Sequence, residues 1–290
     1  MVESGPDARI STNGKPPILP AFFIVGPPRT GTTWLHNVLS QCAWLSHPTK
    51  ETRYFDKYFD RGIAWYRTHY KRANHTRVIG EVAPTYFASA QARERIAELI
   101  PTARIVCTFR DPVERVLSLY RLKRAYGWIS WTFEDALSRD PELIESSRYS
   151  AHLSEWIRVF GPAQVMATLQ EDMATDPQAY LNRIVDFLGI ARLKLQSHQL
   201  QRALASEGLT LPRNQCWTRG ALRLAEWSKA RRLNALVAAA KNVGGLRFFI
   251  GGGPPFPEIR PSLLTALRAF FRPEVERMEW MLNRDLSAWK

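Results

Sequence analysis

The stretch FFIVGPPRTGTTWL, residues 22–35, decides the fold class because it passes from a strand through a glycine-rich turn into a helix. AFFIV (21–25) is a short apolar run closed by glycine, which is the pattern of a buried parallel strand. TTWLHNVLSQ (32–41) carries its apolar residues at helical spacing. Backbone N–H groups and the helix dipole favour an anion at such a helix start, so the turn predicts an anion site.

The turn has the outline of a G-x-x-x-x-G-K-[ST] phosphate loop, with four residues between Gly26 and Gly31, but Thr32 stands at the lysine position. In triphosphate hydrolases that lysine binds the β- and γ-phosphates, and the next Ser or Thr binds magnesium. The cation inside this loop is Arg29, so the loop can bind a phosphate and hold a guanidinium beside a developing charge. An ordinary strand-to-helix turn with polar caps is the alternative.

Strand and helix patterns alternate along the following chain. Apolar runs predict strands at 77–82, 104–109 and 164–169, and helical periodicity predicts helices at 89–100, 112–127, 147–160 and 175–189. This alternation predicts an α/β fold of the P-loop type, a parallel sheet flanked by helices on both faces. Beyond residue 190 the pattern is helical and basic, with helices at 219–241 and 273–289 and a Gly/Pro-rich loop at 244–258.

Composition and charge set wider limits. Residues 1–20 are polar and rich in Pro and Gly, which predicts a disordered leader before a single domain at 21–290. We expect a cytoplasmic protein, because there is no run of about 18 apolar residues and no secretory signal pattern. The three cysteines match no metal or redox spacing. The formal net charge of +13 attracts anions, which include nucleotides, acidic sugars, nucleic acid and anionic membrane surfaces.

A second basic cluster follows the strand at 104–109. Arg110 lies at the strand's end, the edge where ligands of open α/β sheets bind, and Ser118 lies two turns into the next helix. Asp111-Pro112 is a helix start. Arg110 and Ser118 therefore predict a second phosphate site, although a plain salt bridge is an equal alternative for Arg110. Two anion sites on one sheet edge suggest a nucleotide with phosphates at both ends of its ribose.

At these motifs the sequence resembles the sulfotransferases that use 3′-phosphoadenosine 5′-phosphosulfate. GPPRTGTTWL (26–35) is similar to their 5′-phosphosulfate loop, and RDPVERVLSLY (110–120) to their 3′-phosphate motif. KETRYFDKYFDRGIAWYRTHY (50–70) and GEVAPTYF (80–87) resemble the heparan sulfate O- and N-sulfotransferase branch, as do YSAHLSEWIRVFG (149–161), EDMATDPQAYLNRIVDFLG (171–189) and LNRDLSAW (282–289). The resemblance covers roughly residues 20–190 well and the remainder in pieces.

The resemblance implies a cosubstrate, 3′-phosphoadenosine 5′-phosphosulfate, no metal, and roles for particular residues. Arg29 would stabilise the departing phosphate, Glu51 would act as general base, and Lys50 would polarise the site or touch the transferred group. His47 is the competing base, and a solvated charge pair is the alternative for Lys50 and Glu51. The residues implied to bind the nucleotide are Arg29, Thr30, Gly31, Thr32, Thr33, Trp34, Arg110, Ser118, Arg219 and Gly220, with Arg213 as a second candidate for the closing loop.

The acceptor is less well defined by the resemblance. Heparan-type enzymes have a lysine where this sequence has Val82, which puts an acceptor as acidic as heparan in doubt. We expect transfer to a hydroxyl, less often an amine, of a small molecule, glycolipid or carbohydrate. The residues assigned to the acceptor are Tyr54, Pro84, Tyr86 and Trp128, for whose aromatic members the alternative is a core position.

Two other classes of function remain open from the sequence. A nucleotide kinase or other P-loop NTPase is disfavoured by Thr32. A protein that binds nucleic acid or a membrane surface is suggested by the charge, but the basic residues do not form one run. We therefore expect no nucleic-acid partner and leave a peripheral membrane contact open. The sequence does not determine an oligomeric state.

Overall fold

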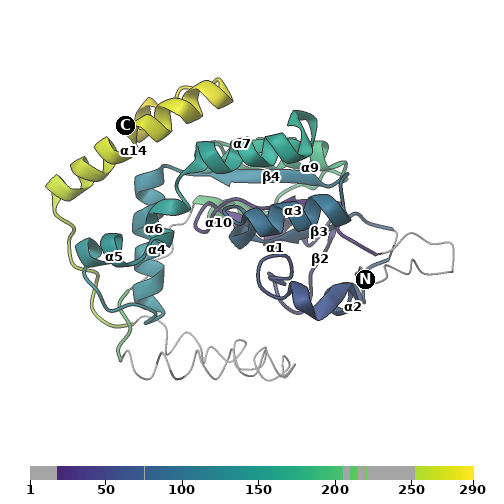
Figure 1. The fold of residues 1–290 in the computed structure, drawn as a ribbon, viewed down its shortest axis with the longest axis horizontal. Coiled ribbons are helices and arrows are strands. Elements are labelled where there is room, and N and C mark those ends of the chain that lie inside the picture. The colour runs from purple at the N-terminus through teal and green to yellow at the C-terminus, as the bar shows by residue number, and fades with distance from the viewer. Residues whose placement is uncertain (1–17, 75, 205–209, 215–217, 219, 221–251) are drawn as a thin grey trace, which may run out of the picture.

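The computed structural model describes residues 18–74, 76–204, 210–214, 218, 220 and 252–290. Within these residues, one sheet has five parallel strands in the order β2-β3-β1-β4-β5. The strands are β1 (Phe22–Ile24), β2 (Trp44–Leu45), β3 (Ile79–Val82), β4 (Arg104–Phe109) and β5 (Val165–Leu169). Because β1 lies between β3 and β4, the residues that follow these three strands share one edge of the sheet (Figure 1).

Helices connect and cover these strands. In the described ranges they are α1 (Thr32–Leu39), α2 (Gly62–Arg67), α3 (Ala90–Leu99), α4 (Pro112–Ala125), α5 (Phe133–Arg139), α6 (Glu142–Glu145), α7 (Tyr149–Phe160), α8 (Gln170–Thr175), α9 (Pro177–Leu188), α10 (Ser197–Leu204) and α14 (Pro261–Leu282). Short 3₁₀ turns are η1 (Phe59–Arg61), η2 (Thr68–Tyr70), η3 (Pro84–Tyr86), η4 (Pro162–Gln164) and η5 (Ser287–Trp289).

Alternate residues of the strands face opposite sides of the sheet, as the period of a β-strand requires. Phe23 and Ile105 pack on one side in a cluster that includes residues of α3 and α7. Phe22 and Val106 pack on the other side in a cluster that includes residues of α1 and α9. Both faces are thus buried, which explains why these strands read as continuous apolar runs and confirms the predicted α/β fold.

A third apolar cluster stands beside the sheet. It joins α4, α5 and α6, and two residues of α14, Leu267 and Phe271, complete it. Figure 1 shows α14, in yellow, running along the outside of the molecule from the α4–α5 side to α7. The C-terminal helix therefore packs against the helix that follows β4.

The sequence located most elements, and their caps explain why. Asp111 accepts hydrogen bonds from the N–H groups of Val113 and Glu114 at the start of α4, and Asp176 caps α9. The pattern missed β2, which has two residues, and the short helices α2, α5, α6 and α8. Short elements carry too few residues to show a period.

The prediction for the last helix was wrong at both ends. It placed the helix at 273–289, whereas α14 begins at Pro261 and keeps Pro273 inside it. The helix ends at Leu282, where Asn283 adopts a left-handed conformation, and η5 follows. A proline in a helix interior removes one backbone hydrogen bond, and packing of α14 on two sides offsets that loss.

Several predictions lie outside the described residues. These include residues 1–17 of the leader, the helix at 219–241 apart from Gly220, most of the loop at 244–258, and Arg219. The single domain at 21–290 stays a prediction. In the part of the chain that the structure describes, no helix is both long enough and apolar enough to span a bilayer.

Candidate functional site

The loop between β1 and α1 lies directly against β4. A Cβ atom on Gly26 would come within 1.9 Å of the Thr108 hydroxyl oxygen and 2.5 Å of the Thr108 backbone nitrogen. Thr30 fixes the loop from the other end, because its hydroxyl lies 2.7 Å from the Pro27 carbonyl and 2.6 Å from the Thr108 hydroxyl. Position 26 therefore requires glycine, and the loop is held rigidly at the carboxyl end of the sheet.

The loop then turns sharply into α1. Arg29 has φ of 80° and Gly31 has φ of 87°, and both values lie in the left-handed region. For arginine this conformation is strained, and such strain concentrates at functional sites. Among the residues that the structure describes, no side chain caps the start of α1 at Gly31, and the first turn of α1 holds no acidic residue. The N–H groups at this helix start are thus available to an anion, as the sequence predicted.

The two predicted phosphate motifs meet in the structure. Arg29 Nε donates a hydrogen bond to Ser118 Oγ at 2.9 Å, across 89 residues of sequence. Ser118 belongs to α4, and Arg110 lies between the end of β4 and the start of that helix. The Arg110 guanidinium lies 3.4 Å from the Glu114 carboxylate, so the salt bridge that the sequence left open does form. Because the two charged groups are 3.4 Å apart and partly exposed, their ion pair is weak. A phosphate can therefore replace Glu114 as the partner of Arg110.

Lys50 brings an ammonium group to the loop from elsewhere in the chain. Its Nζ lies 3.4 Å from Thr32 Oγ1 and 3.2 Å from Thr33 Oγ1, at the first turn of α1. The same nitrogen lies 3.4 Å from a carboxylate oxygen of Glu51. A lysine from the segment after β2 thus stands beside Thr32, the position at which nucleotide triphosphate loops carry their own. Glu51 is linked to the loop by its ion pair with Lys50.

His47 is arranged differently from Glu51. It is exposed, and its backbone N–H donates to the His69 carbonyl at 2.9 Å. Although the residue is largely exposed, partial desolvation of the ring and the nearby charge of Arg72 lower the pKa of the imidazole. A lowered pKa favours the uncharged imidazole, which can accept a proton, whereas Glu51 is tied through Lys50 to the phosphate loop.

The segment that carries Lys50 and Glu51 is anchored by a buried carboxylate that the sequence did not single out. Glu81, on β3, accepts hydrogen bonds from the Thr52 hydroxyl at 2.6 Å and from the Thr52 N–H at 3.0 Å. Its other oxygen accepts from the Tyr66 hydroxyl at 2.6 Å. Burial raises the pKa of Glu81, and these donors partly offset that effect. The available signal was the position of Glu81 in GEVAPTYF, a segment already recognised as a motif.

Three of the four residues assigned to the acceptor lie in the protein core. Tyr54, Pro84 and Tyr86 are buried, which corrects the idea that these side chains present surface to a ligand. The Tyr54 ring stacks on Tyr66 with centroids 4.5 Å apart, and the Tyr86 hydroxyl donates to Glu81 at 3.2 Å. The Tyr54 ring is thus engaged in aromatic packing, and the Tyr86 hydroxyl is engaged by the buried Glu81 carboxylate. Trp128, in contrast, is 52% exposed and remains accessible.

The residues assigned to the nucleotide divide in a similar way. Trp34 is buried, and its indole N–H donates to the Gln199 carbonyl at 2.9 Å, so only its backbone can serve an anion at the helix start. The Thr30 hydroxyl is used within the loop. Gly220 is exposed, and Arg213 donates to the Gly252 carbonyl at 2.9 Å. Nothing described brings either residue to the loop, so a closing role stays a prediction for both.

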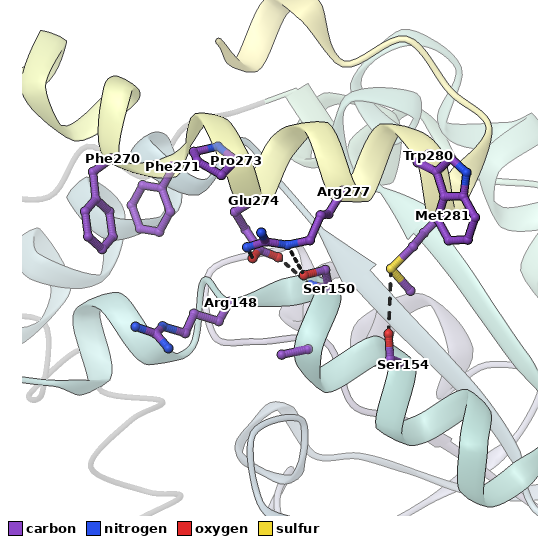
Figure 2. Close-up of a pocket in the computed structure, with 11 residues that line it drawn as sticks. Arg148, Ser150, Ser154, Phe270, Phe271, Pro273, Glu274, Arg277, Trp280 and Met281 are labelled. Carbon is purple, nitrogen blue, oxygen red and sulfur yellow. Dashed lines mark hydrogen bonds and ion pairs between the residues drawn. The ribbon is translucent and has the colours of Figure 1, made fainter.

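A groove between α7 and α14 is separate from these residues. Figure 2 shows Arg148, Ser150 and Ser154 on one side and side chains of α14, among them Phe270 and Trp280, on the other. Arg277 donates to Ser150 Oγ at 3.2 Å across it. The lining includes no residue that the sequence assigned to the nucleotide, the chemistry or the acceptor.

Comparison with known proteins agrees with this geometry. The family model described as "Sulfotransferase family" matches residues 20–193. Human heparan sulfate glucosamine 3-O-sulfotransferase 3B1 is 30% identical over 189 residues, which cover 62% of this chain and 48% of that protein. Human heparan sulfate glucosamine 3-O-sulfotransferase 6 is 26% identical over 276 residues, covering 92% of this chain and 73% of that protein.

Two further similarities broaden the picture. Bovine bifunctional heparan sulfate N-deacetylase/N-sulfotransferase 2 is 31% identical over 195 residues, covering 59% of this chain and 22% of that protein. Among solved structures, a sulfotransferase from Alicyclobacillus acidocaldarius has a TM-score of 0.66 at 22% identity and covers 93% of this chain and 98% of its own, which shows a shared fold. This chain spans about half the length of the first of these curated relatives.

Proposed function

Because the chain belongs to the sulfotransferase family, we propose that it transfers a sulfuryl group from 3′-phosphoadenosine 5′-phosphosulfate to an acceptor hydroxyl and releases adenosine 3′,5′-bisphosphate. The observation that carries this proposal is the 2.9 Å hydrogen bond from Arg29 Nε to Ser118 Oγ, because it joins two anion-binding motifs at one sheet edge. A nucleotide with phosphates on both sides of its ribose fits such a pair of sites.

The residues around the loop supply the groups that sulfuryl transfer needs. As the sulfur moves to the acceptor oxygen, the bond from sulfur to the bridging phosphate oxygen breaks and negative charge grows on that phosphate. Arg29 and Lys50 are the cations at the loop that stabilise this charge. The acceptor hydroxyl must lose its proton, and we propose Glu51 as the base that takes it.

The Lys50–Glu51 contact has a consequence for that role. Lys50 Nζ lies 3.4 Å from the Glu51 carboxylate, so this ion pair holds the proposed base beside the loop. The same ammonium touches Thr32 and Thr33 at the helix start. One lysine therefore connects the base to the place where the donor's phosphate binds.

We propose a hydroxyl of a carbohydrate, glycolipid or small molecule as the acceptor, with an amine as the less favoured alternative. The relatives named for heparan sulfate support a carbohydrate. By the motif resemblance, Val82 stands at the position where a lysine is expected in that branch. A less acidic sugar fits this difference. We also propose a cytoplasmic location and no nucleic-acid partner.

Two measurements test the proposal. Calorimetry without metal should detect binding of adenosine 3′,5′-bisphosphate, and AMP should bind more weakly because it lacks the 3′-phosphate. A transfer assay with radiolabelled sulfate donor, run against a panel of hydroxylated metabolites, lipids and sugars, should identify the acceptor. Equal affinities for AMP and the bisphosphate would contradict the assignment of a 3′-phosphate site. Magnesium-dependent ATP turnover would establish a P-loop NTPase instead.

A further inference from the structure

The C-terminal end of the chain returns to the residue that follows Arg110. Trp289, in η5, donates its indole N–H to Glu171 Oε1 at 3.1 Å, and the Asp111 N–H donates to the same oxygen at 3.1 Å. Arg268 Nη1, on α14, donates to Asp111 Oδ2 at 3.2 Å and to the Trp289 carbonyl at 3.1 Å. These four residues form a closed ring of hydrogen bonds.

The ring holds two polar groups of Asp111, and the helix that Asp111 caps holds a third. Oδ1 caps α4 by accepting from the N–H groups of Val113 and Glu114, at 2.8 and 3.2 Å. Oδ2 is held by Arg268, and the backbone N–H is held by Glu171. Asp111 and Trp289 are both buried, so these hydrogen bonds are shielded from competing water.

The position of Asp111 determines where its neighbours lie. Arg110 precedes it directly, and Ser118 lies two turns further along the helix that Asp111 caps. The ring therefore fixes the position at which the chain leaves β4 and the position at which α4 begins. Because α4 is well packed, a shift at its start moves the residues further along it, including Ser118. In addition, α14 packs on α4 through Leu267 and Phe271.

We infer that Arg268 and Trp289 are positioning residues for the 3′-phosphate site, acting through Asp111 on Arg110 and Ser118. This inference rests on the proposed function, because it needs a ligand that carries a 3′-phosphate. It assigns the C-terminal helix a part in nucleotide discrimination, in addition to its packing.

Calorimetry with two nucleotides tests this on the full chain. Trp289→Phe removes the indole N–H and keeps an aromatic ring, and Arg268→Gln removes the guanidinium that spans Asp111 and Trp289. We expect each variant to bind adenosine 3′,5′-bisphosphate about five- to tenfold more weakly, in the range for a lost hydrogen bond. Binding of AMP should stay within about twofold, since AMP makes no demand on the 3′-phosphate site.

The control variant is Arg284→Gln, which breaks an exposed ion pair with Asp172 close to the same chain end but outside the ring. It should leave both affinities unchanged. Thermal melting identifies any loss of folding. Variants that melt earlier but keep the wild-type ratio of the two affinities would overturn the inference in favour of a purely structural role. A wild-type protein that binds both nucleotides equally would instead overturn the proposed function.

Discussion

Arg29 and Ser118 are hydrogen-bonded, Nε to Oγ at 2.9 Å, although they come from motifs on two different strand-to-helix connections. The contact orients the guanidinium from its Nε side, because a planar arginine held at one nitrogen presents the others in a fixed direction. A lysine at position 29 would keep the charge and lose that direction. The pair therefore couples the loop to α4.

Removal of the Arg29 guanidinium should slow transfer to every acceptor. We expect Arg29→Ala to lower kcat about 10²- to 10³-fold, the range for a lost stabilising donor, and Arg29→Lys to restore part of this loss. Ser118→Ala serves as the matched partner and should mainly weaken nucleotide binding. Steady-state kinetics with two unrelated acceptors checks the prediction, and a loss confined to one of them would point to acceptor binding.

The Glu51 carboxylate is expected to carry the proton transfer. Glu51→Gln should lower kcat by about 10²- to 10⁴-fold while the affinity for adenosine 3′,5′-bisphosphate stays nearly constant. His47→Asn is the comparison, and it should retain most of its turnover. If instead Glu51→Gln is fully active and His47→Asn is not, the base is His47.

The anchor at Thr52 should affect turnover more than nucleotide binding. Thr52→Val loses the 2.6 Å hydrogen bond to Glu81 and so frees the segment that carries Lys50 and Glu51. We expect kcat to fall about tenfold with little change in nucleotide affinity, and Thr52→Ser to recover it because the hydroxyl returns. A loss of turnover in the serine variant, with wild-type turnover in the valine variant, would show that the methyl group, and so packing, matters instead.

Glu81 should give the protein a pH-dependent stability of definite sign. Because burial raises the pKa of Glu81 in the folded protein, its contribution is fully present below the unfolded value, about 4.5, and is lost as pH rises through the folded pKa. Glu81→Gln cannot titrate and lacks this dependence. Urea unfolding of both proteins between about pH 4 and pH 8 should show the wild type losing stability relative to the variant. A constant difference across that range would contradict the prediction.

The close approach at Gly26 should make this position intolerant of a side chain. In Gly26→Ala the new Cβ would lie 1.9 Å from Thr108 Oγ1 and 2.5 Å from its backbone nitrogen, so no side-chain rotation relieves the clash. We expect a loss of about 2–3 kcal/mol or more in the free energy of unfolding. Gly220→Ala is the control, since a Cβ there meets no atom of the described residues within 4 Å. Similar free energies of unfolding in both variants would contradict the close approach of Gly26 to Thr108.

The sequence by itself determined the alternating strands and helices, the phosphate loop, and the helix cap at Asp111, because each is a local pattern of a few neighbouring residues. The tertiary structure decided what required distant residues to meet. Lys50 meets the loop that lacks a lysine, and Trp289 meets Asp111 through the Glu171 oxygen to which both donate. It also decided that Tyr86 serves a buried carboxylate, since burial depends on the whole packed chain and no local pattern contains it.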